Sequence, residues 1–104
     1  MPLSVIITTF NEAAHIGAAL ESVRWADDII VVDSFSTDDT VAIAHTYTQR
    51  VLQRAYKGPA DQKNWAIPQA RHEWILLLDA DERITPDLQA EIQHWLAQPD
   101  IPYD

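Results

Sequence analysis

The sequence predicts an α/β fold in which a parallel sheet carries helices on both faces. Two observations support this prediction. Four short apolar runs alternate along the 104 residues with four segments whose apolar residues recur at helical spacing. No repeat, low-complexity tract or linker interrupts the alternation, so we expect a single domain. Strands that are joined through helices run parallel with right-handed crossovers, which gives a Rossmann-like sheet.

The first half of the chain contains two strand–helix units. Residues 3–8 are a short β-branched run, and in residues 28–33 four apolar residues stand between Asp28 and Asp33, as expected of strands that are buried on both faces. After the first strand, Asn11 is the expected N-cap of a helix that continues through Val23. After the second strand, Ser36 is the expected N-cap of a helix with an acidic first turn.

The second half contains two more units. Residues 50–54 form a shorter strand that we expect near a sheet edge, and residues 73–78 form the fourth strand. The helix between them must end or bend at Pro68, which cannot donate a backbone hydrogen bond. Thr85 is the expected N-cap of the last helix, and a proline follows it at the first helical position.

Polar clusters follow three of the predicted strands. They are Thr8-Thr9-Phe10-Asn11-Glu12, Asp33-Ser34 and Asp79-Ala80-Asp81. In open parallel sheets, ligands bind outside the carboxyl ends of the strands, at the point where the strand order reverses. Because the three clusters follow strands of the same sheet, they predict one site at one edge of that sheet.

Asp79 and Asp81 predict a divalent metal in this site. Carboxylate oxygens are hard ligands that suit Mg²⁺ or Mn²⁺, and such ions are held by one or two carboxylates together with substrate phosphates. Either aspartate could instead be a turn residue, as is common where a strand leaves a sheet. The convergence of three polar clusters favours the metal, and with it a phosphorylated ligand.

The composition limits the partners and the location. The 16 acidic residues against 7 Lys and Arg give a net charge of −9, which argues against nucleic acid as a partner. The absence of cysteine excludes disulfides, thiolate metal sites and cysteine nucleophiles. We expect a cytoplasmic protein, because no apolar stretch is long enough to cross a bilayer and the first residues do not resemble a signal peptide.

Three segments resemble the inverting glycosyltransferases of family 2, which have the GT-A fold. Ser4–Glu12 is similar to the first strand and base-binding loop of that family, Ile30–Asp38 to its second-strand motif, and Leu78–Glu82 to its metal-binding Asp-x-Asp. Residues 56–58 and 62–66 look most like the branch that adds sugars to the lipopolysaccharide core, often called β-1,4-glucosyltransferases. The resemblance implies the strand order 3-2-1-4. Many family members have Asp-Gly where this chain has Ser-Phe at positions 34 and 35.

The resemblance also implies a site for a UDP-sugar donor. The residues implied to contact the nucleotide are Thr8, Phe10, Glu12, Asp33, Lys63 and Asp79. Thr8, Phe10 and Glu12 would line the base, and Asp33 would hydrogen-bond the uracil or the ribose. Lys63 would lie by the base or the diphosphate. Asp79 would meet the ribose or the metal, and Asp81 would ligate the Mg²⁺ or Mn²⁺ that bridges the two phosphates.

The length of the chain implies that part of the enzyme is absent. Family members use a second half of similar size for the acceptor and the catalytic base, which inverting transfer requires. Residues 1–104 therefore match the donor-binding half, and we expect the catalytic base to lie outside this chain. In a full-length enzyme, which could be peripheral at the inner face of the membrane, the implied acceptor is the lipopolysaccharide core or another glycan or lipid-linked acceptor.

Three alternatives share this architecture. A response-regulator receiver would carry an acidic pair after its first strand, where this chain has Thr8-Thr9-Phe10-Asn11. A sugar nucleotidyltransferase needs a glycine-rich loop there, and Gly17 and Gly58 are the only glycines in the sequence. A nucleotide-binding or regulatory module without transfer activity stays open.

The fourth strand predicts self-association. In the implied strand order, residues 74–78 have one open hydrogen-bonding edge, which in the family adjoins the absent half. An open apolar edge is a template for pairing with another chain, and a two-fold dimer is the commonest closed arrangement. The alternative is that residues 99–104 fold over this edge. We favour the homodimer.

Overall fold

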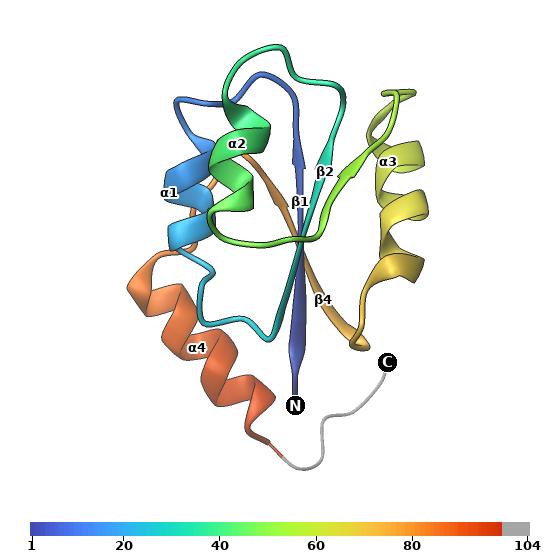
Figure 1. The fold of residues 1–104 in the computed structure, drawn as a ribbon. Coiled ribbons are helices and arrows are strands. Elements are labelled where there is room, and N and C mark those ends of the chain that lie inside the picture. Colours follow the sequence, from blue (N-terminus) through green and yellow to red (C-terminus); the bar gives the residue numbers. More distant parts are fainter. Residues whose placement is uncertain (99–104) are drawn as a thin grey trace.

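The computed structural model describes residues 1–98 and confirms the α/β fold (Figure 1). The elements follow one another as β1 (Leu3–Thr9), α1 (Ile16–Glu21), β2 (Asp28–Asp33), α2 (Thr40–His45), β3 (Val51–Gln53), α3 (Pro59–Ala66), a 3₁₀ turn η1 (Ile67–Gln69), β4 (Trp74–Asp79) and α4 (Pro86–Leu96). The four strands are parallel in the order β3-β2-β1-β4, which confirms the order 3-2-1-4. No helix in residues 1–98 is long and apolar enough to cross a membrane.

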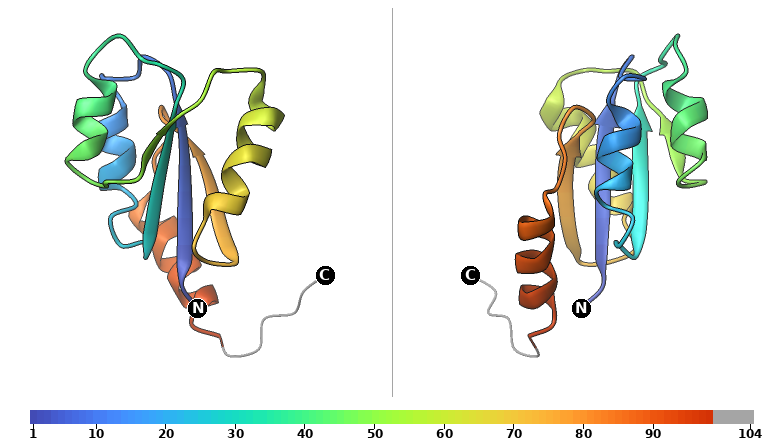
Figure 2. Two further views of the ribbon diagram at one scale, coloured as in Figure 1. Left: turned by 45° about the vertical axis from the view of Figure 1, so that its right-hand side comes forward. Right: turned by 90° about the vertical axis from the view of Figure 1, so that its left-hand side faces the viewer.

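Helices cover both faces of the sheet, as predicted (Figures 1 and 2). Helices α1, α2 and α4 pack on one face, where Ile16, Leu20, Ala44 and Leu96 join the larger buried cluster. Helix α3 covers the other face, and its Ala66 packs against the inner strands there. Strand β1 supplies buried side chains to both clusters, which explains why its sequence is apolar without alternation.

The strand register brings the carboxyl ends of three strands together. Thr8 of β1 pairs with Asp79 of β4, and Thr9 of β1 pairs with Asp33 of β2. The polar clusters that follow these strands therefore leave the sheet at the same edge. This confirms that the sheet brings them to one place.

Two predicted helix caps were wrong, because each side chain bonds to a residue on another segment. Asn11 lies outside α1 with a φ of +50°, and its Oδ1 accepts a hydrogen bond from the backbone N–H of Thr37 at 2.8 Å. Helix α1 begins only at Ile16 and ends at Glu21. Ser36 does not cap α2, which begins at Thr40; its hydroxyl donates instead to Asp33 Oδ1 at 2.5 Å.

The boundaries in the second half follow the predictions more closely. Thr85 caps α4, since its Oγ1 accepts a hydrogen bond from the backbone N–H of Leu88 at 3.2 Å. Pro68 lies in the 3₁₀ turn just after α3, so the helix ends where proline requires it. Strand β3 is short and lies at a sheet edge, as expected, although it covers fewer residues than predicted.

Candidate functional site

A cleft of about 300 Å³ opens at the carboxyl edge of the sheet. It lies between the ends of β1 and β4, the loop after β2, and the start of α3. The residues that line it are Thr8, Thr9, Phe10, Glu12, Ser34, Tyr56, Pro59, Gln62, Lys63, Asp79, Ala80 and Asp81. Six of the seven residues predicted for the site are in this set. The exception is Asp33.

The loop after β1 and the loop after β2, which lie beside the cleft, are joined by reciprocal hydrogen bonds. The backbone N–H of Asn11 donates to Ser36 Oγ at 2.8 Å, while Asn11 Oδ1 accepts from Thr37. Asp38 accepts from the backbone N–H of Ala13 at 3.2 Å and from the Thr40 side chain. The hydrogen bond from the Thr40 hydroxyl lowers the pKa of Asp38, so this carboxylate stays ionised and keeps the loops joined.

Asp79 and Asp81 are both exposed on the cleft, and Ala80 between them is buried. Asp79 Oδ1 accepts a hydrogen bond from Thr8 Oγ1 at 3.1 Å, which orients this carboxylate across the strand ends. The Asp79 backbone N–H donates to Glu82 Oε1 at 2.8 Å, which fixes the turn. The Asp81 carboxylate has no hydrogen-bond or ion-pair partner among residues 1–98, so its oxygens are free for a ligand.

These two carboxylates fit a hard divalent cation that shares its ligands with a substrate. Residues 1–98 contain no group of three or more His, Cys, Asp or Glu side chains placed to hold a metal. A cage made only of side chains is therefore absent from this part of the chain. Mg²⁺ and related ions keep several waters and bind through one or two carboxylates plus phosphates, which is what Asp79 and Asp81 could provide.

The other predicted residues form the walls of the cleft. Phe10 is 56% exposed and presents an aromatic face, as a stacking residue would. Glu12 pairs with His15 at 2.9 Å, between Glu12 Oε2 and His15 Nδ1. Lys63 lines the wall formed by α3 and is the one cation among the described lining residues. The cleft therefore combines the aromatic ring of Phe10, the cation of Lys63 and the carboxylates of Asp79 and Asp81.

Asp33 is placed differently from the other predicted residues. It is fully buried, and its two carboxylate oxygens accept hydrogen bonds from the backbone N–H of Ser36 at 2.8 Å and from Ser36 Oγ at 2.5 Å. In this arrangement Asp33 orders the loop after β2 and does not line the cleft. A direct contact between Asp33 and uracil or ribose stays a prediction. It would require Ser36 to release at least one of its hydrogen bonds to the Asp33 carboxylate.

Comparison with known proteins identifies the family. Residues 4–102 match the profile described as glycosyl transferase family 2. The chain belongs to this family. It is 45% identical over 96 residues to an uncharacterized glycosyltransferase of Rickettsia felis, a match that covers 91% of this chain and 34% of the relative. It is 35% identical over 105 residues to the lipopolysaccharide core biosynthesis glycosyltransferase LpsC of Rhizobium meliloti, covering 96% of this chain and 39% of LpsC.

Solved structures of the family have the same fold. The TarS 1–349 structure from Staphylococcus aureus superposes with a TM-score of 0.78 at 30% identity, covering 92% of this chain and 32% of the TarS 1–349 chain. The complex of the same protein with UDP-GlcNAc gives a TM-score of 0.74 at 28% identity. The chain spans about a third of the length of the curated Rickettsia relatives that it matches. These relatives confirm the GT-A resemblance.

Six lining residues were not among the seven predicted, although three of the six lie in the polar clusters that predicted the site; the six are Thr9, Ser34, Tyr56, Pro59, Gln62 and Ala80. Tyr56 is 61% exposed beside the cleft, in the segment before α3. Ser34 and Gln62 line the cleft and are joined by a hydrogen bond from Gln62 Nε2 to Ser34 Oγ at 2.8 Å. Tyr56 and Gln62 lie in the segments that resemble one branch of family 2, and that resemblance was the only sequence signal for them.

Proposed function

We propose that this family 2 chain binds a UDP-sugar through a divalent metal and forms the donor-binding part of an inverting glycosyltransferase. The observation that carries the proposal is the position of Asp79, Asp81 and Lys63 on one cleft at the carboxyl edge of the sheet. The relation to TarS, which has been solved with UDP-GlcNAc, supports UDP as the nucleotide. Phe10 supplies a face on which the uracil stacks.

The need for a metal follows from the charge of the site. A diphosphate carries at least two negative charges, whereas Lys63 is the only cation lining the cleft in the described part of the chain, against three acidic side chains. Mg²⁺ or Mn²⁺, when bound, neutralises the diphosphate and stabilises it as a leaving group. Asp79 and Asp81 would hold the ion, and the hydrogen bond from Thr8 would keep the Asp79 carboxylate oriented.

The acceptor and the catalytic base are proposed to lie outside this chain. LpsC is named for lipopolysaccharide core biosynthesis, which supports a lipopolysaccharide-core or other glycan acceptor for the whole enzyme. The chain covers only 39% of LpsC, so the remaining length of such a protein has room for an acceptor surface and a base.

Calorimetric titration with UDP tests the proposal. We expect UDP to bind in Mn²⁺ or Mg²⁺ and to lose most of its affinity in chelator. Asp81→Ala should lower the affinity by about ten-fold or more, because loss of even an indirect metal partner has an effect of that size. Asp87→Ala is the matched control, since Asp87 is an exposed aspartate of α4 that does not line the cleft. Equal UDP affinity in chelator and in Mn²⁺ would refute metal-dependent binding.

A further inference from the structure

Gln62 is a buried polar residue in the wall of the cleft. It lies on α3, is 1% exposed, and donates its one side-chain hydrogen bond from Nε2 to Ser34 Oγ at 2.8 Å. Its Oε1 is buried and has no hydrogen-bond partner among residues 1–98. Leaving a buried amide oxygen unpaired destabilises a fold, because the group has lost water and gained nothing in exchange. The stability of the fold therefore does not explain a glutamine at this position.

Exchanging the oxygen and nitrogen of the amide does not remove the problem. The flipped amide could accept from the Ser34 hydroxyl, but its nitrogen would then be the buried atom without a partner. An apolar side chain of similar length would fill the same volume without burying an unpaired group. Only a hydrogen-bonding side chain at position 62 can hold the Ser34 hydroxyl in place.

In the described part of the chain, buried side-chain nitrogen or oxygen atoms without a hydrogen-bond partner occur only at the cleft. The only two buried side-chain polar atoms without a partner in residues 1–98 are Gln62 Oε1 and Thr9 Oγ1, and both residues line the cleft. Proteins depart from the rule of full hydrogen bonding mainly at functional sites. The two unpaired atoms therefore indicate that Gln62 has a role in the function of the cleft.

Ser34 is fixed in place but has one hydrogen-bonding group unused. Its backbone N–H donates to the carbonyl of Thr9 at 3.0 Å, which holds it at the end of β2. Its Oγ accepts from Gln62, and the hydroxyl proton has no acceptor among residues 1–98. A serine hydroxyl has one donor and two acceptor positions, so the contact in which Gln62 Nε2 donates leaves the Ser34 donor free. Ser34 lines the cleft, and a ligand there can take this hydrogen bond.

We propose that the Ser34 hydroxyl donates a hydrogen bond to an oxygen of the bound uridine, either a base carbonyl or a ribose hydroxyl, and that Gln62 is the positioning residue that sets its direction. This inference rests on the proposed function and adds a nucleoside contact to it. The contact is independent of the metal, because Asp79 and Asp81 serve the diphosphate. Ser34 and Gln62 would therefore select the nucleoside, whereas Asp79 and Asp81 would bind the charged diphosphate through the metal.

The test is titration of Ser34→Ala and Gln62→Met with three probes in Mn²⁺: UDP, 2′-deoxy-UDP and inorganic diphosphate. Each variant should bind UDP about two- to ten-fold more weakly than the unmodified chain, the range that one hydrogen bond supplies, and diphosphate equally well. The double variant should bind no more weakly than the weaker single one, because both changes remove the same contact. Gln62→Met should unfold at the same temperature as the unmodified chain or higher.

The results separate this inference from the proposed function. If the unmodified chain binds UDP in Mn²⁺ and both variants bind it equally well, the Ser34 contact is wrong and the metal site stands. Equal losses of UDP and diphosphate affinity would also refute the nucleoside contact. A lower unfolding temperature for Gln62→Met with unchanged UDP affinity would assign Gln62 a structural role only. If the effect of Ser34→Ala is seen with UDP but disappears with 2′-deoxy-UDP, the acceptor is the ribose 2′-hydroxyl; if it persists, the acceptor is another uridine oxygen.

Discussion

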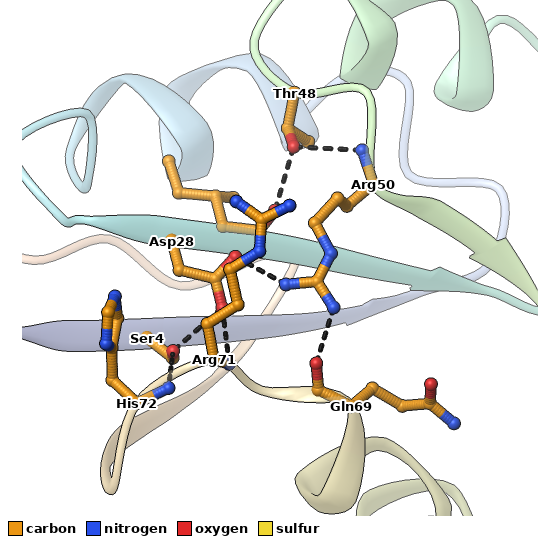
Figure 3. Close-up of polar contacts among 8 residues, drawn as sticks. Ser4, Asp28, Thr48, Arg50, Gln69, Arg71 and His72 are labelled. Carbon is orange, nitrogen blue, oxygen red and sulfur yellow. Dashed lines mark hydrogen bonds and ion pairs between the residues drawn. The ribbon is translucent and has the colours of Figure 1, made fainter.

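Arg50 donates a hydrogen bond from Nη1 to Asp28 Oδ1 at 2.6 Å (Figure 3). Asp28 begins β2, so this contact lies at the end of the sheet opposite the cleft. The Asp28 side chain is 1% exposed, and its other oxygen accepts from Ser4 Oγ at 2.8 Å and from the Arg71 backbone N–H at 3.0 Å. Arg50 also donates to the Gln69 carbonyl. One buried carboxylate thus joins β1, the start of β3 and the segment before β4.

The first prediction is that Asp28→Asn destabilises the fold without affecting the cleft. The amide cannot balance the charge of Arg50, and its NH2 group would face either the Arg50 donor or the Ser4 and Arg71 donors. We expect a loss of about 1–3 kcal/mol of unfolding free energy, measured by urea denaturation. Arg50 is a quarter exposed, so solvent screening keeps the loss below that of a fully buried pair. An unchanged unfolding free energy would mean that the hydrogen-bond network around Asp28 does not stabilise the fold.

The second prediction concerns acid. Burial alone would raise the pKa of Asp28, but the hydrogen bonds from Arg71, Ser4 and Arg50 together outweigh it, and the pKa is lowered. A carboxyl whose pKa is lower in the folded state stabilises the fold above its unfolded pKa, and this stabilisation is lost as the pH falls through the folded pKa. The unfolding free energy should therefore fall below about pH 4. In the Asp28→Asn variant, the unfolding free energy should decrease less over the same pH range.

The overall fold could be predicted because it depends on local and periodic features. The alternation of apolar runs and helical segments predicted the elements, and the cap at Thr85 is a contact within four residues. The caps at Asn11 and Ser36 were wrong because a local pattern does not show that the two side chains bind each other's loops. Gln62 was missed for a related reason: its partner Ser34 is 28 positions away, and only the packing of α3 on the sheet joins them.

The backbone at Phe35 explains why glycine suits this position of the family pattern. Phe35 has a φ of +60°, in the left-handed region that favours glycine, and it stands where many family 2 members have glycine. The side chain is 59% exposed, so it gains little from burial. The sequence indicated the departure, but the backbone conformation that makes it unfavourable is visible only in the structure.

The third prediction concerns Asn11, which also has a positive φ, of +50°. Asn11→Ala removes the hydrogen bond with Thr37 and the polar side chain that lets asparagine tolerate the left-handed region, so we expect a loss of about 1–3 kcal/mol of unfolding free energy by urea denaturation. Asn11→Gly also removes the hydrogen bond but suits the backbone conformation. It should therefore be the less destabilising change. If alanine were tolerated better than glycine, the backbone strain would not matter at this position.

The fourth prediction is that this polypeptide alone transfers no sugar to a lipopolysaccharide-type acceptor. The chain spans about a third of its curated relatives, and we assign the base and the acceptor surface to the remainder. At most we expect slow hydrolysis of a UDP-sugar, followed by release of UDP. Transfer at a rate well above that hydrolysis would contradict the prediction. The base would then have to be sought among Glu12, Glu82 and Asp87.

The last prediction is a homodimer through the β4 side of the sheet. Strand β4 is an edge strand that pairs only with β1 among the described strands, and Leu77 on it is 38% exposed. Beside it, an apolar groove of about 360 Å³ lies between β4 and α4, with Leu88 and Trp95 40% and 45% exposed on its rim. Apolar surface next to an open strand edge favours pairing with a second copy. The net charge of −9 opposes this pairing, and salt should weaken that repulsion.

Sedimentation at micromolar concentration, in low and in physiological salt, measures the dimer. We expect a dimer for the unmodified chain and a monomer for Leu77→Lys, because a charge on an edge strand opposes pairing. Ala90→Lys is the matched control for added positive charge: it also adds one charge, but Ala90 is an exposed residue of α4 that does not line the groove, so this change should leave strand pairing in place. The alternative cover, residues 99–104, lies outside the described part of the chain. A clean monomer, with the amides of residues 75–78 protected from exchange, would refute the dimer and leave the tail as the segment that covers the edge.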